Sequence, residues 1–291
     1  MKVKHTNDVK IVECPRDAMQ GLTTFIPTEK KITYLNKLLQ VGFDILDFGS
    51  FVSAKAVPQM ADTEAVLNGI EVGDSKTALL AIVANTRGAE TAASFESINY
   101  LGFPLSISET FQQRNTNKSI TEALNTLAEI RDVCSKKNKK LVTYISMGFG
   151  NPYGDPYEPA LVSQFADILI TLGTDVISLA DTIGAATPSQ IKEIVGTVVK
   201  QYTSVEIGVH LHANPNTALE KIASAYESGC RRFDGALRGF GGCPMAKDEL
   251  VGNIATEQVI SFVESKGAYT GINSNTLHEA MTLSYEIFPK H

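Results

Sequence analysis

The chain has 291 residues, of which 43% are hydrophobic and 20% are charged, and its formal net charge is −6. This charge excludes nonspecific nucleic-acid binding, because no basic surface is available to neutralise phosphates, and no apolar run is long enough to cross a membrane. The four cysteines show no CxxC spacing and the N-terminus has neither an apolar signal core nor an Arg- and Ser-rich transit peptide. We therefore expect a cytoplasmic protein without disulfides.

Strand-like and helix-like segments alternate from residue 9 to residue 267. The first pair is an apolar strand at 9–15 and an amphipathic helix at 28–42, with Thr28 as its N-cap and Gly42 as its stop signal. Further strands are predicted at 43–49, 76–84, 98–107, 140–148, 175–182, 206–212 and 231–237. The helices predicted behind them are at 61–70, 87–95, 119–137, 160–173, 189–202, 217–229 and 255–267.

Eight strand–helix repeats with near-continuous apolar strands predict a parallel sheet closed into a (β/α)8 TIM barrel. We expect one domain over residues 1–291, with the barrel at about 9–267 and a helical extension at about 273–288. Leu277, Met281 and Ile287 of this extension would pack on the barrel flank or on a partner subunit. The main rival is a doubly wound open sheet, which would normally carry a Gly-rich dinucleotide loop, and VECPRDAMQG after the first strand is not GxGxxG.

Two histidines, His210 and His212, end the seventh predicted strand. Residues two apart in a strand point to the same face, so both imidazoles could bind one divalent metal ion. A bare HxH pair is equally often a pair of polar residues at a sheet edge. The metal interpretation therefore depends on further ligands from other strands.

Catalytic groups of a TIM barrel gather at the carboxyl ends of its strands. This rule collects one set of candidate residues at one mouth: Arg16, Asp17, Asp47, Glu109, Asp181, Thr182, His210, His212, Cys243 and Asn253. Asp17 would add a carboxylate to the histidine pair, and Asn253 would add an amide oxygen or cap the helix that begins near Ala255. Two imidazoles and two oxygens leave room on a six-coordinate ion for a chelating substrate, and they suit Mg, Mn or Zn.

Arg16 is a fixed cation beside this predicted site, suited to a developing oxyanion or enolate. Alternatively, Arg16 would only form a salt bridge at the barrel mouth, with Asp47 or Glu109 as its partner. Cys243 lies in the Gly-rich segment GFGGCPMAK. A Gly-rich loop with one thiol is typical of a mobile lid that carries an acid or a base. Alternatively, Cys243 is a small buried hydrophobic residue. The remaining cysteines are predicted to be structural: Cys14, Cys134 and Cys230.

Six motifs occur in order over residues 9 to 285: CPRDAMQ, SFVSAKAVPQMAD, ISLADTIGAATP, VHLHAN, GFGGCP and GNIATE. Together they resemble the hydroxymethylglutaryl-CoA lyase family, which belongs to a metal-dependent barrel superfamily that also contains the isopropylmalate and homocitrate synthases. The resemblance implies a cation bound by four residues, Asp17, His210, His212 and Asn253. It also implies that Arg16 stabilises an enolate, that Cys243 transfers a proton from a mobile loop, and that the chain forms a homodimer.

The implied reaction is cleavage of a 3-hydroxy-3-methylglutaryl-CoA-like acyl-CoA into acetyl-CoA and acetoacetate. The resemblance implies catalytic roles for Arg16, Asp17, Asp47, His210 and Cys243, with Asp17 or one histidine as the base. Substrate contacts are expected from Arg16, Glu109, Asp181 and Thr182, and coenzyme A contacts from the region 108–117, including Arg114.

Three departures from the family pattern stand out. Asp47 replaces a glutamate, PRDAMQ replaces PRDGLQ, and the loop from Cys243 to Asn253 is one residue longer and contains KDELV. Shortening a catalytic carboxylate matters, because a displacement of about 1 Å is costly in an active site. The exact acyl group therefore stays open.

Two other functions remain: a carboligating synthase of the same superfamily and a non-catalytic barrel that retains the ion. The GGCP loop favours the lyase over the synthases. A metal-dependent hydrolase is disfavoured, because its HxH lies typically on the first strand, which here carries an Arg-Asp pair instead.

Overall fold

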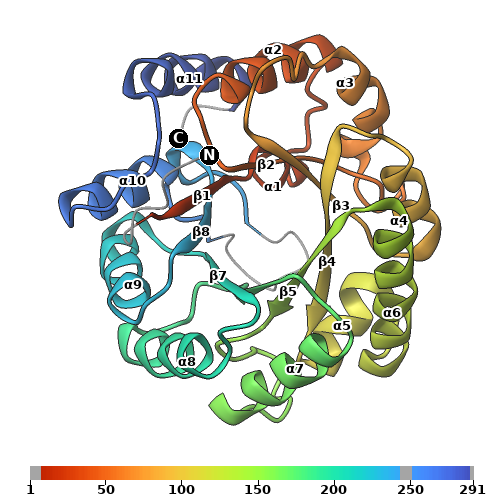
Figure 1. Cartoon of the computed structure of the whole chain (residues 1–291), viewed down its shortest axis with the longest axis vertical. Helices are drawn as coiled ribbons and strands as arrows, with labels where there is room; N and C mark the ends of the chain where they lie inside the picture. The colour runs from red at the N-terminus through yellow and green to blue at the C-terminus, as the bar shows by residue number, and fades with distance from the viewer. Residues whose placement is uncertain (1–7, 243–250, 289–291) are drawn as a thin grey trace.

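The computed structural model describes residues 8–242 and 251–288. Eight parallel strands close into a barrel in sequence order, and helices surround it (Figure 1). The strands are β1 (Lys10–Glu13), β2 (Ile45–Ser50), β3 (Ala78–Ile82), β4 (Ile98–Ser106), β5 (Lys140–Ser146), β6 (Val176–Asp181), β7 (Glu206–Leu211) and β8 (Arg232–Gly235). β8 pairs with β1, with Lys10 opposite Arg232, so the sheet has no free edge. The predicted TIM barrel is confirmed.

The predicted outer helices are also confirmed. They are α2 (Thr28–Leu39), α3 (Thr63–Gly69), α4 (Thr86–Ala93), α6 (Ile120–Lys137), α7 (Pro159–Thr171), α8 (Pro188–Gln201), α9 (Pro215–Glu227) and α10 (Thr256–Ser265). The C-terminal α11 (Ser274–Ile287) lies beside α2 (Figure 1), and Leu277, Met281 and Ile287 pack against the barrel's own hydrophobic core. Over the two described ranges, no helix has both the length and the hydropathy of a membrane span.

Short helical segments were not predicted from the sequence, because they are too short to show the helical periodicity of apolar residues. They are α1 (Pro15–Gln20), α5 (Glu109–Thr116) and the 3-10 turns η1 (Pro58–Met60) and η2 (Leu237–Gly239). The predicted ends of α2 were wrong, since Thr28 is not its N-cap residue and Gly42 does not directly follow its last turn. Thr28 is the first helical residue, with its hydroxyl donating to Asp62 Oδ2 (2.8 Å), and the helix ends at Leu39, before Gly42.

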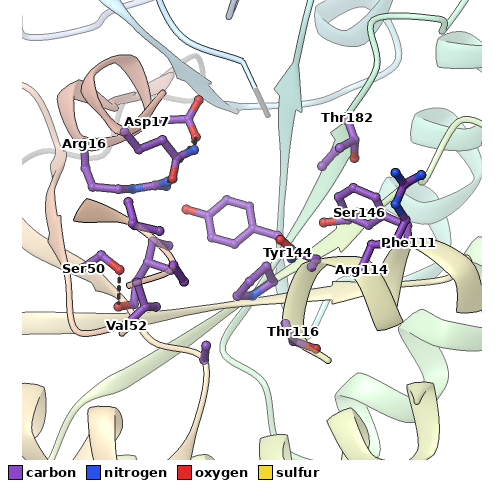
Figure 2. A pocket seen from close by; sticks show the side chains of 18 of the residues that line it. Arg16, Asp17, Ser50, Val52, Phe111, Arg114, Thr116, Tyr144, Ser146 and Thr182 are labelled. Atoms are coloured by element: carbon purple, nitrogen blue, oxygen red, sulfur yellow. Dashed lines mark hydrogen bonds and ion pairs between the residues drawn. The ribbon is translucent and has the colours of Figure 1, made fainter. Parts of the chain in front are cut away.

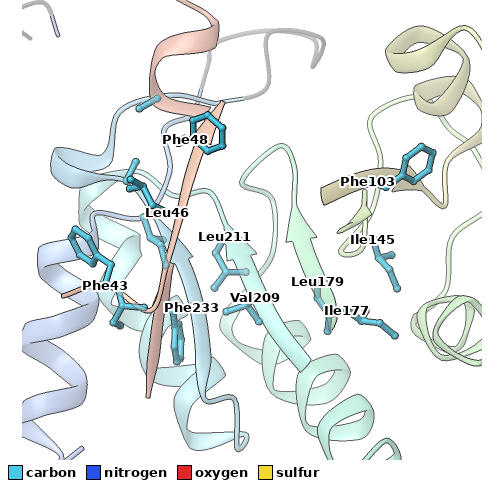
Figure 3. Close-up of a cluster of buried hydrophobic side chains, with 14 of the residues drawn as sticks. Phe43, Leu46, Phe48, Phe103, Ile145, Ile177, Leu179, Val209, Leu211 and Phe233 are labelled. Atoms are coloured by element: carbon cyan, nitrogen blue, oxygen red, sulfur yellow. The ribbon is translucent and has the colours of Figure 1, made fainter. Parts of the chain in front are cut away.

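The strands alternate between two environments. Outward residues such as Leu46, Phe103, Ile145 and Val209 form the apolar layer beneath the helices (Figure 3). Inward residues of β1 to β6 form a second, smaller apolar cluster: Val12, Cys14, Ile45, Leu80, Ile82, Val142, Tyr144 and Val176. On β7 and β8 the inward positions carry polar or charged residues instead, including His210, Arg232 and Asp234. The interior is thus mostly apolar along β1 to β6, with Asp47 and Ser178 as exceptions, and mostly polar along β7 and β8, where the two histidines of the site lie.

Glu13 is a buried acid outside the site, on the outward face of β1. Its Oε1 accepts from Leu237 N (2.9 Å) and its Oε2 accepts from Thr256 Oγ1 (2.5 Å). Burial raises the pKa of Glu13 from its usual 4.5 to about 8. The folded chain therefore binds this proton more tightly than the unfolded chain does, so its contribution to stability is lost as pH rises from 4.5 to about 8.

Glu13→Gln removes this titration while keeping an acceptor for Leu237 N. The variant should lose less stability than the wild type as pH rises through that window, because no carboxylate has to ionise in the core. Thermal melts followed by circular dichroism at several pH values measure the difference. Parallel curves of melting temperature against pH for the two proteins would contradict it.

Candidate active site

Arg16 and Asp17 lie on α1, which begins at Pro15 directly after β1 and places both side chains over the barrel mouth (Figure 2). Proline suits this position, because the first turn of a helix does not use its N–H. Arg16 donates from Nη1 to Asp17 Oδ1 (3.0 Å), and from Nε (3.0 Å) and Nη2 (2.5 Å) to Asp47 Oδ2. The salt bridge with Asp47 therefore forms, and Arg16 also lines the pocket.

Asp47 points inward from β2 and has no exposed surface. It stands behind Arg16 and is not part of the pocket wall. Burial raises the pKa of Asp47 to about 6, against the opposing effect of Arg16. Burial would also raise the pKa of Asp17, but Arg16 and the two histidines outweigh it and lower that pKa to about 2. Asp17 is therefore an anion at neutral pH.

The histidine pair meets Asp17 at the mouth. Asp17, His210 and His212 each offer a ligand atom, and these atoms all lie within 4.8 Å of one another. His212 Nδ1 donates to Thr182 O (2.9 Å), while its Nε2 is buried and has no hydrogen-bond partner in the part of the chain that the structure describes. Burial, together with His210, lowers the pKa of His212, so this ring is neutral with a free lone pair. Burial would lower the pKa of His210 too, but Asp234 and Asp17 outweigh it and raise that pKa.

Asn253 reaches the site through a backbone contact with the end of β7. Asn253 and His212 form an antiparallel bridge, and Ile254 N donates to Leu211 O (3.0 Å). Its Nδ2 donates to Asp17 Oδ2 (2.7 Å) and to Phe240 O (2.8 Å). The alternative of helix capping is wrong, because α10 begins after Ala255 and has no side-chain cap.

The Gly-rich segment before Asn253 is packed against the site. Gly241 has φ +98°, and a Cβ there would lie 2.7 Å from Asn253 Nδ2 and 2.9 Å from Asp17 O. Only glycine permits both this conformation and this close approach. The segment therefore fixes the position of Asn253 against Asp17.

These residues fit a divalent cation. Asn253 Oδ1 is buried and, like His212 Nε2, finds no hydrogen-bond partner among residues 8–242 and 251–288. Buried acceptors without a partner are rare and call for an explanation. An anionic oxygen, an amide oxygen and neutral imidazoles form the mixed donor set that Mg, Mn and Zn accept.

The side chains of Asp181 and Thr182, at the end of β6, point to opposite sides of the barrel wall. Asp181 points outward and is paired with Lys221 of α9 (Oδ2 to Nζ, 2.7 Å), so the prediction that it faces the mouth was wrong. Adjacent residues of a strand point to opposite faces, and Thr182 is the inward one, lining the pocket. Lys221 Nζ also donates to His212 O (2.8 Å), so this ion pair holds the backbone of the histidine pair.

The structure does not place two other predicted site residues, Glu109 and Cys243, beside Asp17 and the histidines. Glu109 is exposed at the start of α5, where its carboxylate accepts from Ile120 N (3.1 Å), and it does not line the pocket. α5 could have been recognised from Ser108, whose hydroxyl caps it by accepting from Phe111 N (3.2 Å). Cys243 lies outside the described residues.

The pocket at the mouth has a volume of about 460 Å³ and is shown in Figure 2. Arg16, Asp17, Thr182 and both histidines line one part of it, and residues 114–118 line another. Its remaining wall includes residues that were not predicted as site residues, among them Ser50, Val52, Ile82, Pro104, Tyr144, Ser146 and Ala180. The alternation of side chains along a strand predicts that several of these residues point into the barrel. It does not show which inward residues line the pocket and which are buried in the closed interior.

Fold and site together define a (β/α)8 barrel with a candidate divalent-metal centre at the carboxyl ends of its strands. The chain belongs to the HMGL-like family, whose sequence model matches residues 8–283. It is 34% identical over 266 residues to the hydroxymethylglutaryl-CoA lyase YngG of Bacillus subtilis, covering 91% of this chain and 88% of that protein. It is 35% identical over 275 residues to the human cytoplasmic 3-hydroxy-3-methylglutaryl-CoA lyase, covering 94% of this chain and 73% of that protein.

Solved structures agree with this assignment. The HMG-CoA lyase of Bacillus subtilis has a TM-score of 0.90 at 32% identity, covering 99% of this chain and 98% of that one. An HMG-CoA lyase from Acinetobacter baumannii, in complex with coenzyme A and 3-methylmalate, has a TM-score of 0.89 at 32% identity, covering 96% of this chain and 90% of that one.

His212→Gln tests the candidate metal centre. The variant should bind Mn²⁺ more than about 100-fold more weakly than the wild type, because losing a direct ligand should cost more than the 10- to 100-fold typical of an outer partner. Isothermal titration calorimetry measures both affinities. His278→Gln is the matched control, since His278 is exposed on α11. Equal Mn²⁺ affinity in the two variants would rule out His212 as a ligand.

Proposed function

We propose that this protein is a carbon–carbon lyase that cleaves 3-hydroxy-3-methylglutaryl-CoA into acetyl-CoA and acetoacetate. The observation that carries the proposal is the convergence of Asp17, His210 and His212 within 4.8 Å, beside Arg16, in a pocket of about 460 Å³. Membership of the HMGL-like family and identities of 34–35% to hydroxymethylglutaryl-CoA lyases support it.

Asp17, His210, His212 and Asn253 would hold a divalent cation, with Mg or Mn as the first choice and Zn as the alternative. When bound, such a cation supplies Lewis-acid polarisation that lowers the pKa of a substrate hydroxyl. The chain must also accept the hydroxyl proton. The candidate bases are Asp17 and one of the histidines, and a histidine can accept the proton only through a ring nitrogen that binds neither a proton nor the cation. Asp17, whose pKa is lowered to about 2, is better suited to binding a cation than to acting as a base.

Arg16 would stabilise the charge that develops when the carbon–carbon bond breaks. Burial alone would lower the pKa of Arg16, but Asp47 and Asp17 outweigh it and raise it, so the guanidinium stays charged. A fixed cation held by two carboxylates neutralises the enolate oxygen of acetyl-CoA without having to reorganise. Asp47 would act through Arg16, and the resemblance assigns protonation of the enolate carbon to Cys243.

The coenzyme A part of the substrate would lie toward residues 111–118. Phe111 and residues 114–118 line the pocket there, and Arg114 and Lys118 add positive charge suited to phosphates. Thr182 is the remaining predicted substrate contact on the pocket wall. A cytoplasmic location, a homodimer and a single domain stay predictions from the resemblance and the sequence.

The direct test is an assay with purified protein, Mg²⁺ or Mn²⁺ and 3-hydroxy-3-methylglutaryl-CoA. We expect acetyl-CoA and acetoacetate in equal amounts. Release of free CoA from acetyl-CoA plus a 2-ketoacid would indicate a synthase instead. A bound ion without cleavage of any 3-hydroxyacyl-CoA would indicate a non-catalytic barrel.

Arg16→Gln should lower kcat by about 10²- to 10³-fold, the usual cost of removing one stabilising donor from an oxyanion site. Steady-state kinetics with the same substrate measure the loss, and Arg87→Gln, at an exposed position of α4, is the control. Arg16→Gln should still bind Mn²⁺. A variant with wild-type kcat would remove Arg16 from the mechanism.

A further inference from the structure

A line of alternating charges runs beneath His210, from the buried Asp234 and Arg232 to the partly exposed Glu206 and Lys10 at the opposite end of the barrel. It consists of Lys10 on β1, Glu206 on β7, and Arg232 and Asp234 on β8, and we refer to it as the interior charge column. Lys10 Nζ bonds to Glu206 Oε2, Arg232 Nη1 donates to Glu206 Oε1 (3.3 Å), and Arg232 Nε lies 3.5 Å from Asp234 Oδ1. Layers of branched apolar side chains usually fill this space in the fold, so the column needs an explanation.

The chain makes room for the column. Among residues 8–242 and 251–288, Arg232 is the largest residue whose side chain is fully buried, at 1% exposure. The neighbouring inward position on β7 is Gly208, where a Cβ would lie 2.7 Å from Arg232 Cδ and 2.9 Å from its Cγ. Burying unpaired charges is strongly unfavourable, and the alternation of sign places an opposite charge beside each member. A column that only filled space would be replaced at lower cost by apolar residues.

The upper end of the column meets a candidate metal ligand. Asp234 is the register partner of His210, and its Oδ2 lies 3.7 Å from His210 Nδ1. The same oxygen accepts from Ser178 Oγ (3.1 Å), and Asp234 has no exposed surface. At 3.7 Å the contact with His210 is electrostatic rather than a hydrogen bond. His210 Nδ1 therefore faces the barrel interior, and its Nε2 is left for the mouth, where Asp17 and His212 lie.

We propose that Asp234, held by Arg232 and Ser178, is a positioning residue for His210. It keeps Nδ1 turned into the barrel and presents Nε2 to the cation. A histidine that binds a metal commonly has a carboxylate or carbonyl behind its other nitrogen, which fixes the orientation of the ring. Thr182 O already serves His212 in this way, and Asp234 is the counterpart for His210. The inference rests on the metal centre of the proposed function.

Asp234→Asn tests this role, because it keeps the shape of the side chain and removes its charge. The variant should bind Mn²⁺ about 10- to 100-fold more weakly than the wild type in calorimetric titration, the usual effect of losing such a partner. Ser178→Ala removes one hydrogen bond to the same carboxylate but leaves the charge of Asp234 in place, so it should change the affinity less. Thermal melts report whether each variant is folded.

The outcomes separate the two proposals. A folded Asp234→Asn protein with wild-type Mn²⁺ affinity overturns the positioning role and leaves the metal centre intact. A wild-type protein that binds no Mn²⁺ overturns the metal centre and this inference with it.

A second measurement uses the wild type alone and does not depend on the variant's folding. Nitrogen-15 NMR of histidine-labelled protein with Zn²⁺ identifies the nitrogen of each ring that binds the ion. The two rings that respond to Zn²⁺ should carry the proton on Nδ1 and bind through Nε2, while the other three histidines of the sequence serve as references. The signal that disappears in His212→Gln identifies the His212 ring, and binding of the other responding ring, His210, through Nδ1 would contradict the proposal.

Discussion

The site depends on one buried cation, the guanidinium of Arg16, held between the carboxylates of Asp17 and Asp47. Two buried carboxylates so close together would repel each other and raise each other's pKa. With Arg16 between them, the pKa of Asp17 is low enough to keep it an anion, and Asn253 then donates to its other oxygen. Before a cation binds, Arg16 and Asn253 thus keep the carboxylate of Asp17 charged and oriented.

The ion pair with Arg16 also explains the position of Asp47. Asp47 has no exposed surface and meets Arg16 through two donors. In this chain the carboxylate of Asp47, where the resemblance led us to expect a glutamate, therefore holds the guanidinium of Arg16. The inward apolar cluster comes from β1 to β6, with Asp47 and Ser178 as polar exceptions, and the inward residues of β7 and β8 are mostly charged or polar. Residues from both parts line the pocket.

Local patterns were enough to predict the strands, most helices and the shared face of His210 and His212, because these depend on periodicity along one segment. They failed where the outcome depends on a single residue of register or on a contact between distant segments. Asp181 and Thr182 are neighbours in sequence, yet only Thr182 faces inward. Asn253 was expected at the mouth, but its bridge with His212, a contact between distant segments, was needed to choose between the site and the cap of α10. The charges beneath His210 were not anticipated, because alternation shows that residues share a face but not what lies opposite them.

The most direct test of the central claim is anomalous diffraction from a crystal of the wild-type protein soaked in Mn²⁺. We expect one strong peak at the barrel mouth, bound to Asp17, to Nε2 of both histidines and to Asn253 Oδ1, with Arg16 still paired to Asp47. A peak that lies away from Asp17, or one that leaves Asn253 Oδ1 without a bond, would contradict it.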